Sequence, residues 1–282
     1  MSKRFNLLLL LAVWLLGAAG YAAEAKRVVS LSPALTETIA YLGCLDRLVG
    51  RSSACDYPAT VKALPAVGDF AIPSLEKIVA VRPDLVVADT LKDAGQVKIF
   101  RDLGIDFQVL PLQSIADYKR AVGKLGDWLD CREAAAKEIE RVEREVAAWT
   151  ARRPEKPLKV LLLIWDNPPM TAGRNSFLTE YVALAGGRNI AEAEERDYFS
   201  CAPEWVLQQA PEVVLAPSPP DLAATRQLNL PGGWEALPAV AANRVYTDLD
   251  ETVVNRLGPR LFEGIAAIHR ALYPATPANG GE

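Results

Sequence analysis

The segments Leu35–Gly43 (LTETIAYLG) and Leu178–Gly186 (LTEYVALAG) are two versions of one pattern. A second pair follows in the same order: Glu76–Ala88 ends in the apolar run LVVA, and Glu204–Ala216 ends in VVLA. The second pair lies closer together than the first, so the order of elements is kept while one connection is shorter. The duplication predicts two lobes of the same topology with a cleft between them, and small ligands commonly bind in clefts between domains.

Short apolar runs alternate with helical patterns in both repeats. Leu85–Ala88 and Leu158–Ile164 are apolar without polar alternation, which is typical of parallel strands covered on both faces. Ser32-Pro33 is typical of a helix start, and we expect that helix to end at Gly43. This alternation predicts an α/β protein with two doubly wound, Rossmann-like lobes.

The most regular helical pattern lies between the two repeats. From residue 132 to residue 153, apolar side chains recur at steps of four and three residues, namely Ala135, Ile139, Val142, Val146 and Trp149. A helix of about 22 residues is about 33 Å long. We therefore expect residues 26–130 to form a first lobe, 131–155 a rigid backbone helix and 156–282 a second lobe, with little lobe motion when a ligand binds.

Residues 1–25 have the pattern of a cleaved export signal. Lys3 and Arg4 precede an apolar core, Leu7–Ala18, and small residues follow it. The core is shorter than the roughly 20 residues that cross a bilayer. We expect a mature chain that is exported to the periplasm and not embedded in a membrane; a lipid anchor is not expected because no cysteine lies near the cleavage region.

The composition argues against several classes of protein. The 31 Lys and Arg residues are interleaved with 35 Asp and Glu, so no basic surface for nucleic acid is expected. The chain has one histidine, His269, which we expect to be exposed on a final helix. A metal site with several histidines, a serine-histidine-aspartate triad and the common phosphate-binding motifs are all missing. We therefore expect no catalytic residue, no metal and no resident cofactor.

A series of short strings along the chain resembles one protein family. The strings include Ser32-Pro33, Asp56-Tyr57-Pro58, Asn167-Pro168-Pro169 and Gly258-Pro259-Arg260. In this order they are similar to the helical-backbone substrate-binding proteins of ABC importers, which capture cobalamin, haem or ferric siderophores, and most similar to the cobalamin-binding branch. The resemblance implies a monomeric receptor, not an enzyme, that delivers cobalamin or another corrinoid to an ABC permease dimer. Haem or a ferric siderophore is the alternative ligand.

The resemblance also implies which residues face the ligand. The matching positions are Ala54, Phe70, Asp89, Trp165, Asn167, Met170, Tyr198 and Phe199. Aromatic walls with a few polar groups suit a flat macrocycle with amide side arms. The alternative for each aromatic residue is ordinary core packing. The chain also departs from the cobalamin binders, which often have tryptophan at the position of Phe70 and aromatic residues at or near Ala54 and Asp89.

Two acidic residues match the family's permease contacts. Glu76 and Glu204 each lie seven residues before the proline of their repeat. In the family, one exposed glutamate per lobe docks onto arginines of the permease. The alternative is that each acid only complements the dipole of its helix.

The four cysteines are Cys44, Cys55, Cys131 and Cys201. Cys44 follows the first helix of the first lobe and Cys131 follows its last helix, so both should lie away from the cleft, and we expect a Cys44–Cys131 disulfide. Cys55 and Cys201 should lie near the cleft rim, as buried thiols, as an interlobe disulfide or as metal ligands. An exported α/β redox enzyme that uses these two cysteines is the remote alternative function.

Overall fold

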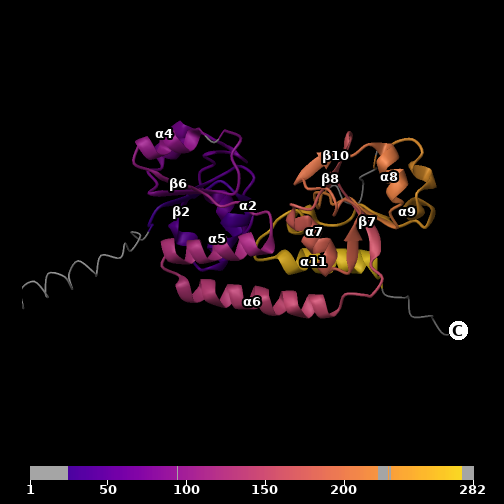
Figure 1. Ribbon diagram of the computed structural model, residues 1–282. Helices are drawn as coiled ribbons and strands as arrows, with labels where there is room; N and C mark the ends of the chain where they lie inside the picture. The colour runs from indigo at the N-terminus through magenta and orange to yellow at the C-terminus, as the bar shows by residue number, and fades with distance from the viewer. Residues whose placement is uncertain (1–24, 94, 222–227, 229, 275–282) are drawn as a thin grey trace, which may run out of the picture.

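The computed structural model describes residues 25–93, 95–221, 228 and 230–274. Two α/β lobes lie side by side, and one long helix runs beneath both of them (Figure 1). The export signal expected at residues 1–25 lies almost entirely outside the described residues. Among the described residues, no helix combines the length and the apolar character needed to cross a membrane.

The first lobe is built on a four-stranded parallel sheet with the strand order β2-β1-β5-β6. Its strands are β1 (Val28–Ser30), β2 (Leu48–Arg51), β5 (Leu85–Ala88) and β6 (Asp106–Val109), with a small hairpin of β3 (Gly68–Asp69) and β4 (Ile72–Pro73). Its helices are α2 (Pro33–Tyr41), α3 (Leu75–Ala80), α4 (Gln96–Asp102) and α5 (Ile115–Trp128), with the 3-10 turns η1 (Leu45–Arg47) and η2 (Ala59–Ala63). All four residues of β5 are buried, as expected for a strand covered on both faces.

The second lobe repeats this sheet and adds to it. Strands β9 (Gly187–Asn189), β7 (Leu158–Asp166), β11 (Val213–Leu215) and β12 (Val245–Tyr246) are parallel in that order. They correspond to β2, β1, β5 and β6. Two antiparallel strands, β8 (Pro169–Ala172) and β10 (Tyr198–Ser200), extend the sheet. The helices are α7 (Phe177–Leu184), α8 (Pro203–Gln209), α9 (Pro238–Ala241), α10 (Glu251–Val254) and α11 (Leu261–Leu272), with the 3-10 turn η3 (Trp234–Ala236).

The repeated sequence patterns form equivalent elements, so the predicted duplication and α/β class are confirmed. Helices α2 and α7 both begin after a serine, Ser32 and Ser176, whose side chain accepts a hydrogen bond from a backbone N–H of the first turn. Both are followed by a glycine with positive φ, 82° at Gly43 and 91° at Gly186. Glycine adopts this conformation without the steric cost that other residues meet.

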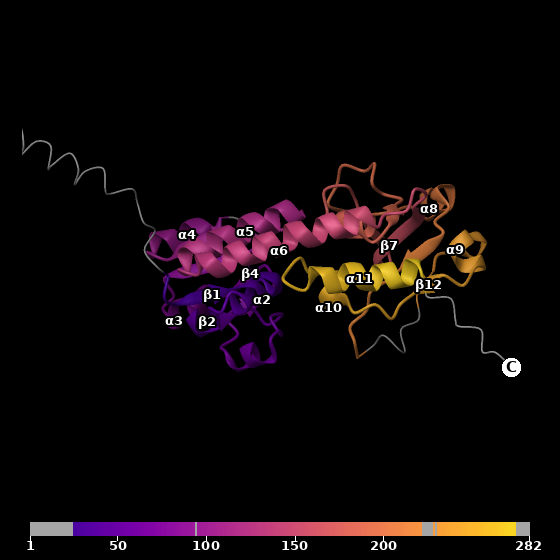
Figure 2. The ribbon, with the colours of Figure 1, turned by 90° about the horizontal axis from the view of Figure 1, so that it is seen from below.

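Helix α6 (Arg132–Ala151) connects the lobes, as predicted from the apolar residues that recur at steps of four and three. Its 20 residues give a length of about 30 Å. Ala135, Val142 and Trp149 are buried, and the remaining members of the predicted apolar face are partly buried. Seen from below, α6 lies along α5 and continues towards α11 (Figure 2). The limits expected for the lobes at residues 130 and 156 remain predictions; the two main sheets lie on either side of α6.

His269 is half-buried, and the expectation of an exposed histidine is wrong. Its Nδ1 atom lies 2.9 Å from the carbonyl oxygen of Ala185. The centroid of its ring is 5.5 Å from that of Trp149 and 5.3 Å from that of Tyr273. The end of α6 covers this side of α11. The pattern of α11 alone could not show which other helix packs against it.

Candidate ligand cleft between the lobes

A cavity of about 480 Å³ lies between the two lobes. Its first-lobe wall comes from the turn between β3 and β4 and from the loops after β5 and β6, and consists of Phe70, Asp89, Thr90, Pro111, Leu112 and Gln113. Its second-lobe wall consists of Ile164, Asn175, Ser176, Phe177, Leu178, Asp197, Tyr198 and Asn255. The loops after β5 and β6 follow the carboxyl ends of parallel strands, where open α/β sheets bind ligands.

A second cavity of about 330 Å³ adjoins the first, since the two share Phe70, Asp89, Leu112, Phe177 and Asn255. It adds residues from both lobes, namely Pro33, Ala34, Ala54, Arg256 and Leu257. Together the two cavities form what we call the interlobe cleft.

Four of the predicted ligand residues meet in the interlobe cleft. Phe70, Asp89 and Tyr198 line the first cavity, and Ala54 lines the second. Phe70 and Tyr198 are each 46% exposed and lie on opposite lobes. An exposed aromatic ring on each wall is suited to hold a large apolar face.

The other predicted ligand residues lie outside these two cavities. Trp165, near the end of β7, is 58% exposed and donates a hydrogen bond from Nε1 to the carbonyl oxygen of Asn167, at 2.8 Å. Met170, in β8, is half-buried. A contact of these three residues with a ligand remains a prediction.

Phe199 packs away from the cleft. Its ring centroid is 5.8 Å from that of Trp205, and the guanidinium of Arg196 lies over it at 5.3 Å. Successive side chains of a strand point to opposite faces. Because Tyr198 lines the first cavity, its neighbour Phe199 is directed to the other side of β10.

Most of the cavity lining was missed from the sequence. Several missed residues follow strands, as Thr90 and Leu112 do, and others lie around the start of α7, as Ser176 and Phe177 do. The rule that ligands bind beyond the carboxyl ends of parallel strands could have identified the first group. Asn255, which follows the short helix α10, had no comparable sequence pattern.

The polar side chains of the first cavity carry no positive charge. Its described lining contains Asp89 and Asp197 but no lysine, arginine or histidine. Gln113 donates a hydrogen bond to Asp197 at 2.7 Å and so links the lobes. Burial raises the pKa of Asp89, although a hydrogen bond from the Ser32 hydroxyl, at 2.8 Å, acts in the opposite direction.

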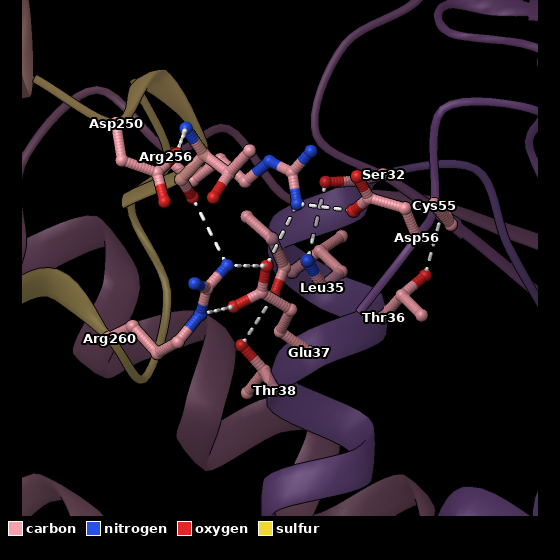
Figure 3. A network of polar contacts seen from close by, with 12 residues as sticks. Ser32, Leu35, Thr36, Glu37, Thr38, Cys55, Asp56, Asp250, Arg256 and Arg260 are labelled. Atoms are coloured by element: carbon pink, nitrogen blue, oxygen red, sulfur yellow. Dashed lines mark hydrogen bonds and ion pairs between the residues drawn. The ribbon is translucent and has the colours of Figure 1, made fainter. Parts of the chain in front are cut away.

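A network of ion pairs joins the lobes beside the cleft (Figure 3). Glu37 of α2, whose side chain is 2% exposed, accepts two hydrogen bonds from Arg260, at 2.9 and 2.8 Å, and one from Arg256 at 3.0 Å. Arg256 also lies 2.6 Å from Asp56. The ring of Tyr57 stacks on Arg260 at 4.1 Å. Arg256 lines the second cavity, but its charge is shared between two carboxylates of the first lobe.

The two acids expected to contact a permease occupy equivalent exposed positions. Glu76 lies in the first turn of α3 and Glu204 in the first turn of α8. No hydrogen bond or ion pair joins either carboxylate to another described residue. Both are therefore available for a partner.

The cysteines are free thiols in the structure. Burial and a hydrogen bond with Cys44 raise the pKa of Cys131 to about 12, so these two thiols are neighbours. Their pairing remains a prediction. Cys55 is buried among the hydroxyls of Thr36 and Ser52, at 3.1 and 3.2 Å, and Cys201 lies 3.6 Å from the carbonyl oxygen of Pro169. Burial raises the pKa of Cys55 and of Cys201, which disfavours the reactive thiolate that redox chemistry needs.

Comparison with known proteins finds relatives along nearly the whole chain. Residues 28–252 match the family model described as "Periplasmic binding protein". The vitamin B12-binding protein of Salmonella paratyphi A is 34% identical over 211 residues, which cover 74% of this chain and 76% of that protein. An uncharacterised ABC transporter substrate-binding lipoprotein of Bacillus subtilis, YvrC, is 27% identical over 262 residues, covering 90% of this chain and 82% of that protein.

Solved structures share the two-lobed architecture with a helical backbone. A periplasmic haem-binding protein of Pseudomonas aeruginosa superposes with a TM-score of 0.77 and 27% sequence identity. The superposition covers 89% of this chain and 94% of that protein.

Proposed function

The chain belongs to the periplasmic binding protein family, and on that premise we propose that it captures a corrinoid such as cobalamin and delivers it to an ABC import permease. Its relatives are substrate-binding transport proteins and not enzymes. We propose that the protein acts in the periplasm after removal of residues 1–25, as a monomer without a catalytic step or a resident cofactor.

One observation carries the choice of ligand: the described lining of the first cavity combines apolar walls with polar side chains that include two carboxylates and no cation. A corrin ring presents apolar faces and an edge of primary amides, whose N–H groups are donors. Asp89, Asp197 and Asn255 offer carboxylate and amide oxygens to such an edge. The vitamin B12-binding relative supports the same choice.

Haem is the second candidate, and two observations favour it. A haem-binding structure superposes well on this chain, and Tyr198 offers a phenol oxygen, which binds haem iron in some proteins. Two further observations oppose it. Partial burial and, to a smaller extent, the charge of Asp197 raise the pKa of Tyr198, although a hydrogen bond with Ser176 acts in the opposite direction. A raised pKa disfavours the phenolate, which is the form that would bind the iron. The first cavity also has no lysine or arginine in its described lining to pair with the two carboxylates of haem.

The test uses the purified mature chain with cyanocobalamin, haem and a ferric siderophore. Quenching of tryptophan fluorescence and coloured ligand that elutes with the protein report binding, and we expect both for cyanocobalamin. Trp165, which is 58% exposed and is one of the predicted ligand residues, should supply part of the quenching, so Trp165→Phe is the control for the optical signal. Tighter binding of haem or the siderophore than of cyanocobalamin would refute the corrinoid assignment.

Delivery is proposed to depend on Glu76 and Glu204. Their equivalent positions on α3 and α8, together with their exposure and lack of partners among the described residues, suit docking of one acid per lobe on a dimeric permease. Exposed ion pairs contribute only about 0–1 kcal/mol each. We therefore propose that they set the orientation and the rate of docking, and contribute little to adhesion.

A further inference from the structure

Two buried oxygen atoms of the interlobe cleft have no hydrogen-bond partner among the residues that the structure describes. They are Oδ1 of Asp89 and Oδ1 of Asn255, and both residues line both cavities. Among the described residues, the other buried side-chain atoms without a partner belong to Gln96 and Thr171, which line neither cavity. A buried acceptor without a donor destabilises the folded state. Two of them in one cleft point to a donor that comes from a ligand and not from the described part of the chain.

The two residues approach the cleft from different lobes. Asp89 directly follows β5 in the first lobe, and Asn255 directly follows α10 in the second. The carboxylate of Asp89 is held in place because its other oxygen, Oδ2, accepts a hydrogen bond from Ser32, the residue that caps the start of α2. The unpaired Oδ1 atom is therefore presented by a fixed group.

We propose that Asp89 and Asn255 form an acceptor site, shared between the lobes, for a primary carboxamide on the edge of the ligand. A carboxamide NH₂ group carries two N–H donors, one for each unpaired oxygen. The inference rests on the proposed function in taking the interlobe cleft as the ligand site. It goes further by assigning the recognition to the two oxygens that lack a partner, and not to Asp197, which already accepts a hydrogen bond from Gln113.

The same site selects against ligands with carboxylate edges. An ionised carboxylate offers only acceptors and cannot satisfy either oxygen. It would also bring a negative charge close to Asp89 and Asp197, in a cavity whose described lining has no positive side chain. Arg256, in the adjoining cavity, is already paired with Glu37 and Asp56. The site therefore disfavours ligands with carboxylate edges as well as favouring those with primary amides.

The first test uses two corrinoids that differ in their edge groups. Cyanocobinamide carries primary amides, and heptamethyl cobyrinate carries methyl esters, which accept hydrogen bonds but cannot donate them. We expect the wild-type protein to bind cyanocobinamide more tightly. Asp89→Leu and Asn255→Leu should each weaken cyanocobinamide binding by about ten- to a hundred-fold and change ester binding little. Phe70→Leu is the matched control, because Phe70 lines the same two cavities without a polar atom and should affect both probes equally.

The second test separates failure of this site from failure of the corrinoid assignment. Haem and its bis-propionamide differ only in carboxylate against primary amide. If no corrinoid binds, the corrinoid assignment fails, but the acceptor site still predicts that the bis-propionamide binds more tightly than haem and that Asp89→Leu removes the preference. The acceptor site is overturned if the protein binds the ester or the carboxylate more tightly than the corresponding amide. It is also overturned if Asp89→Leu weakens binding of both members of a pair equally, or if none of the four probes binds.

Discussion

Glu37 of the first lobe and Arg260 of the second form a two-point ion pair, in which Nε and Nη2 of the arginine lie 2.9 and 2.8 Å from the two carboxylate oxygens. Such bidentate pairs have the most favourable geometry for an arginine and a carboxylate. Arg256 adds a third contact to the same carboxylate. The lobes are thus held together by a buried charge network beside the cleft as well as by α6.

We predict that Glu37→Gln destabilises the protein by about 3–5 kcal/mol, because it leaves two partly buried guanidinium groups without their shared carboxylate. Urea unfolding of the purified chain measures the change. The control is Glu133→Gln on α6, whose side chain is 84% exposed and pairs only with Lys137 among the described residues; it should have no measurable effect. Equal midpoints for wild type and Glu37→Gln would show that the network contributes nothing.

Asp56 should make the free energy of unfolding depend on pH. Burial alone would raise its pKa, but the hydrogen bond and charge of Arg256 outweigh it and hold the pKa of Asp56 below its ordinary value. The Asp56–Arg256 pair therefore contributes fully above the ordinary carboxyl pKa of about 3.9, and its contribution is lost as the pH falls through the lowered pKa.

The measurement is the free energy of unfolding in urea between pH 3 and pH 7 for wild type and Asp56→Asn. The stability difference between the two proteins should be largest at neutral pH and shrink towards pH 3. A difference that is constant over the whole range would contradict the assignment. Other acids of the chain affect both proteins alike and cancel in the comparison.

The helices and strands of the fold could be predicted from the sequence because each is specified by residues close to one another in the chain. The serine before each repeated helix, the glycine after it and the uninterrupted apolar run of β5 each depend on residues close in the chain. The same holds for the stripe of apolar residues on α6. Patterns of this kind can be recognised without knowing what packs against them.

The site was predicted less completely because it depends on contacts between distant segments. Glu37 belongs to a repeated helix pattern and gives no indication that Arg256 and Arg260 lie beside it. Phe199 was expected in the cleft beside Tyr198, although neighbours in a strand face opposite ways. Glu138 is not one of the apolar positions that predicted α6, yet it is buried and accepts a hydrogen bond from the Tyr118 hydroxyl at 2.8 Å.

We predict that Cys44 and Cys131 form a disulfide in the exported protein. The high pKa of Cys131 means that little thiolate is present at pH 7, so reaction with glutathione disulfide should be slow and should accelerate as the pH rises. Each bond formed reduces one glutathione disulfide to two thiols. Closing the long loop between the two cysteines should stabilise the oxidised protein by up to about 4 kcal/mol.

Peptide mapping without reduction identifies the bond, and urea unfolding with and without reductant measures its effect. Cys201→Ser should leave the map unchanged, because Cys201 lies in the second lobe against Pro169. A bridge between Cys55 and Cys131 would refute the prediction. Cys55 is already surrounded by Thr36, Ser52 and the carbonyl oxygen of Ser30.

The double variant Glu76→Ala with Glu204→Ala should abolish ligand uptake and leave ligand affinity unchanged. Both acids are exposed and neither lines the two cavities of the cleft, so removing them should not disturb binding. Uptake is measured in cells that depend on the transporter, and affinity by fluorescence quenching of the purified chain. Glu133→Ala is the control, as an exposed acid on α6 that is not expected to contact the permease. Normal uptake by the double variant would remove the docking role.

Ligand binding should change the overall dimensions of the protein very little. Helix α6 packs against the first lobe through Glu138, which contacts Tyr118, and against the second through Trp149, which contacts His269. Hinge closure would have to bend this helix or break the ion pairs of Glu37 with Arg256 and Arg260. Solution X-ray scattering of the chain with and without saturating ligand should give nearly equal radii of gyration. Glu37→Gln tests whether the ion pairs restrain the lobes, because their loss should widen the distribution of interatomic distances in the ligand-free protein. A large compaction of the wild type on binding would show that neither α6 nor the ion pairs restrain the lobes.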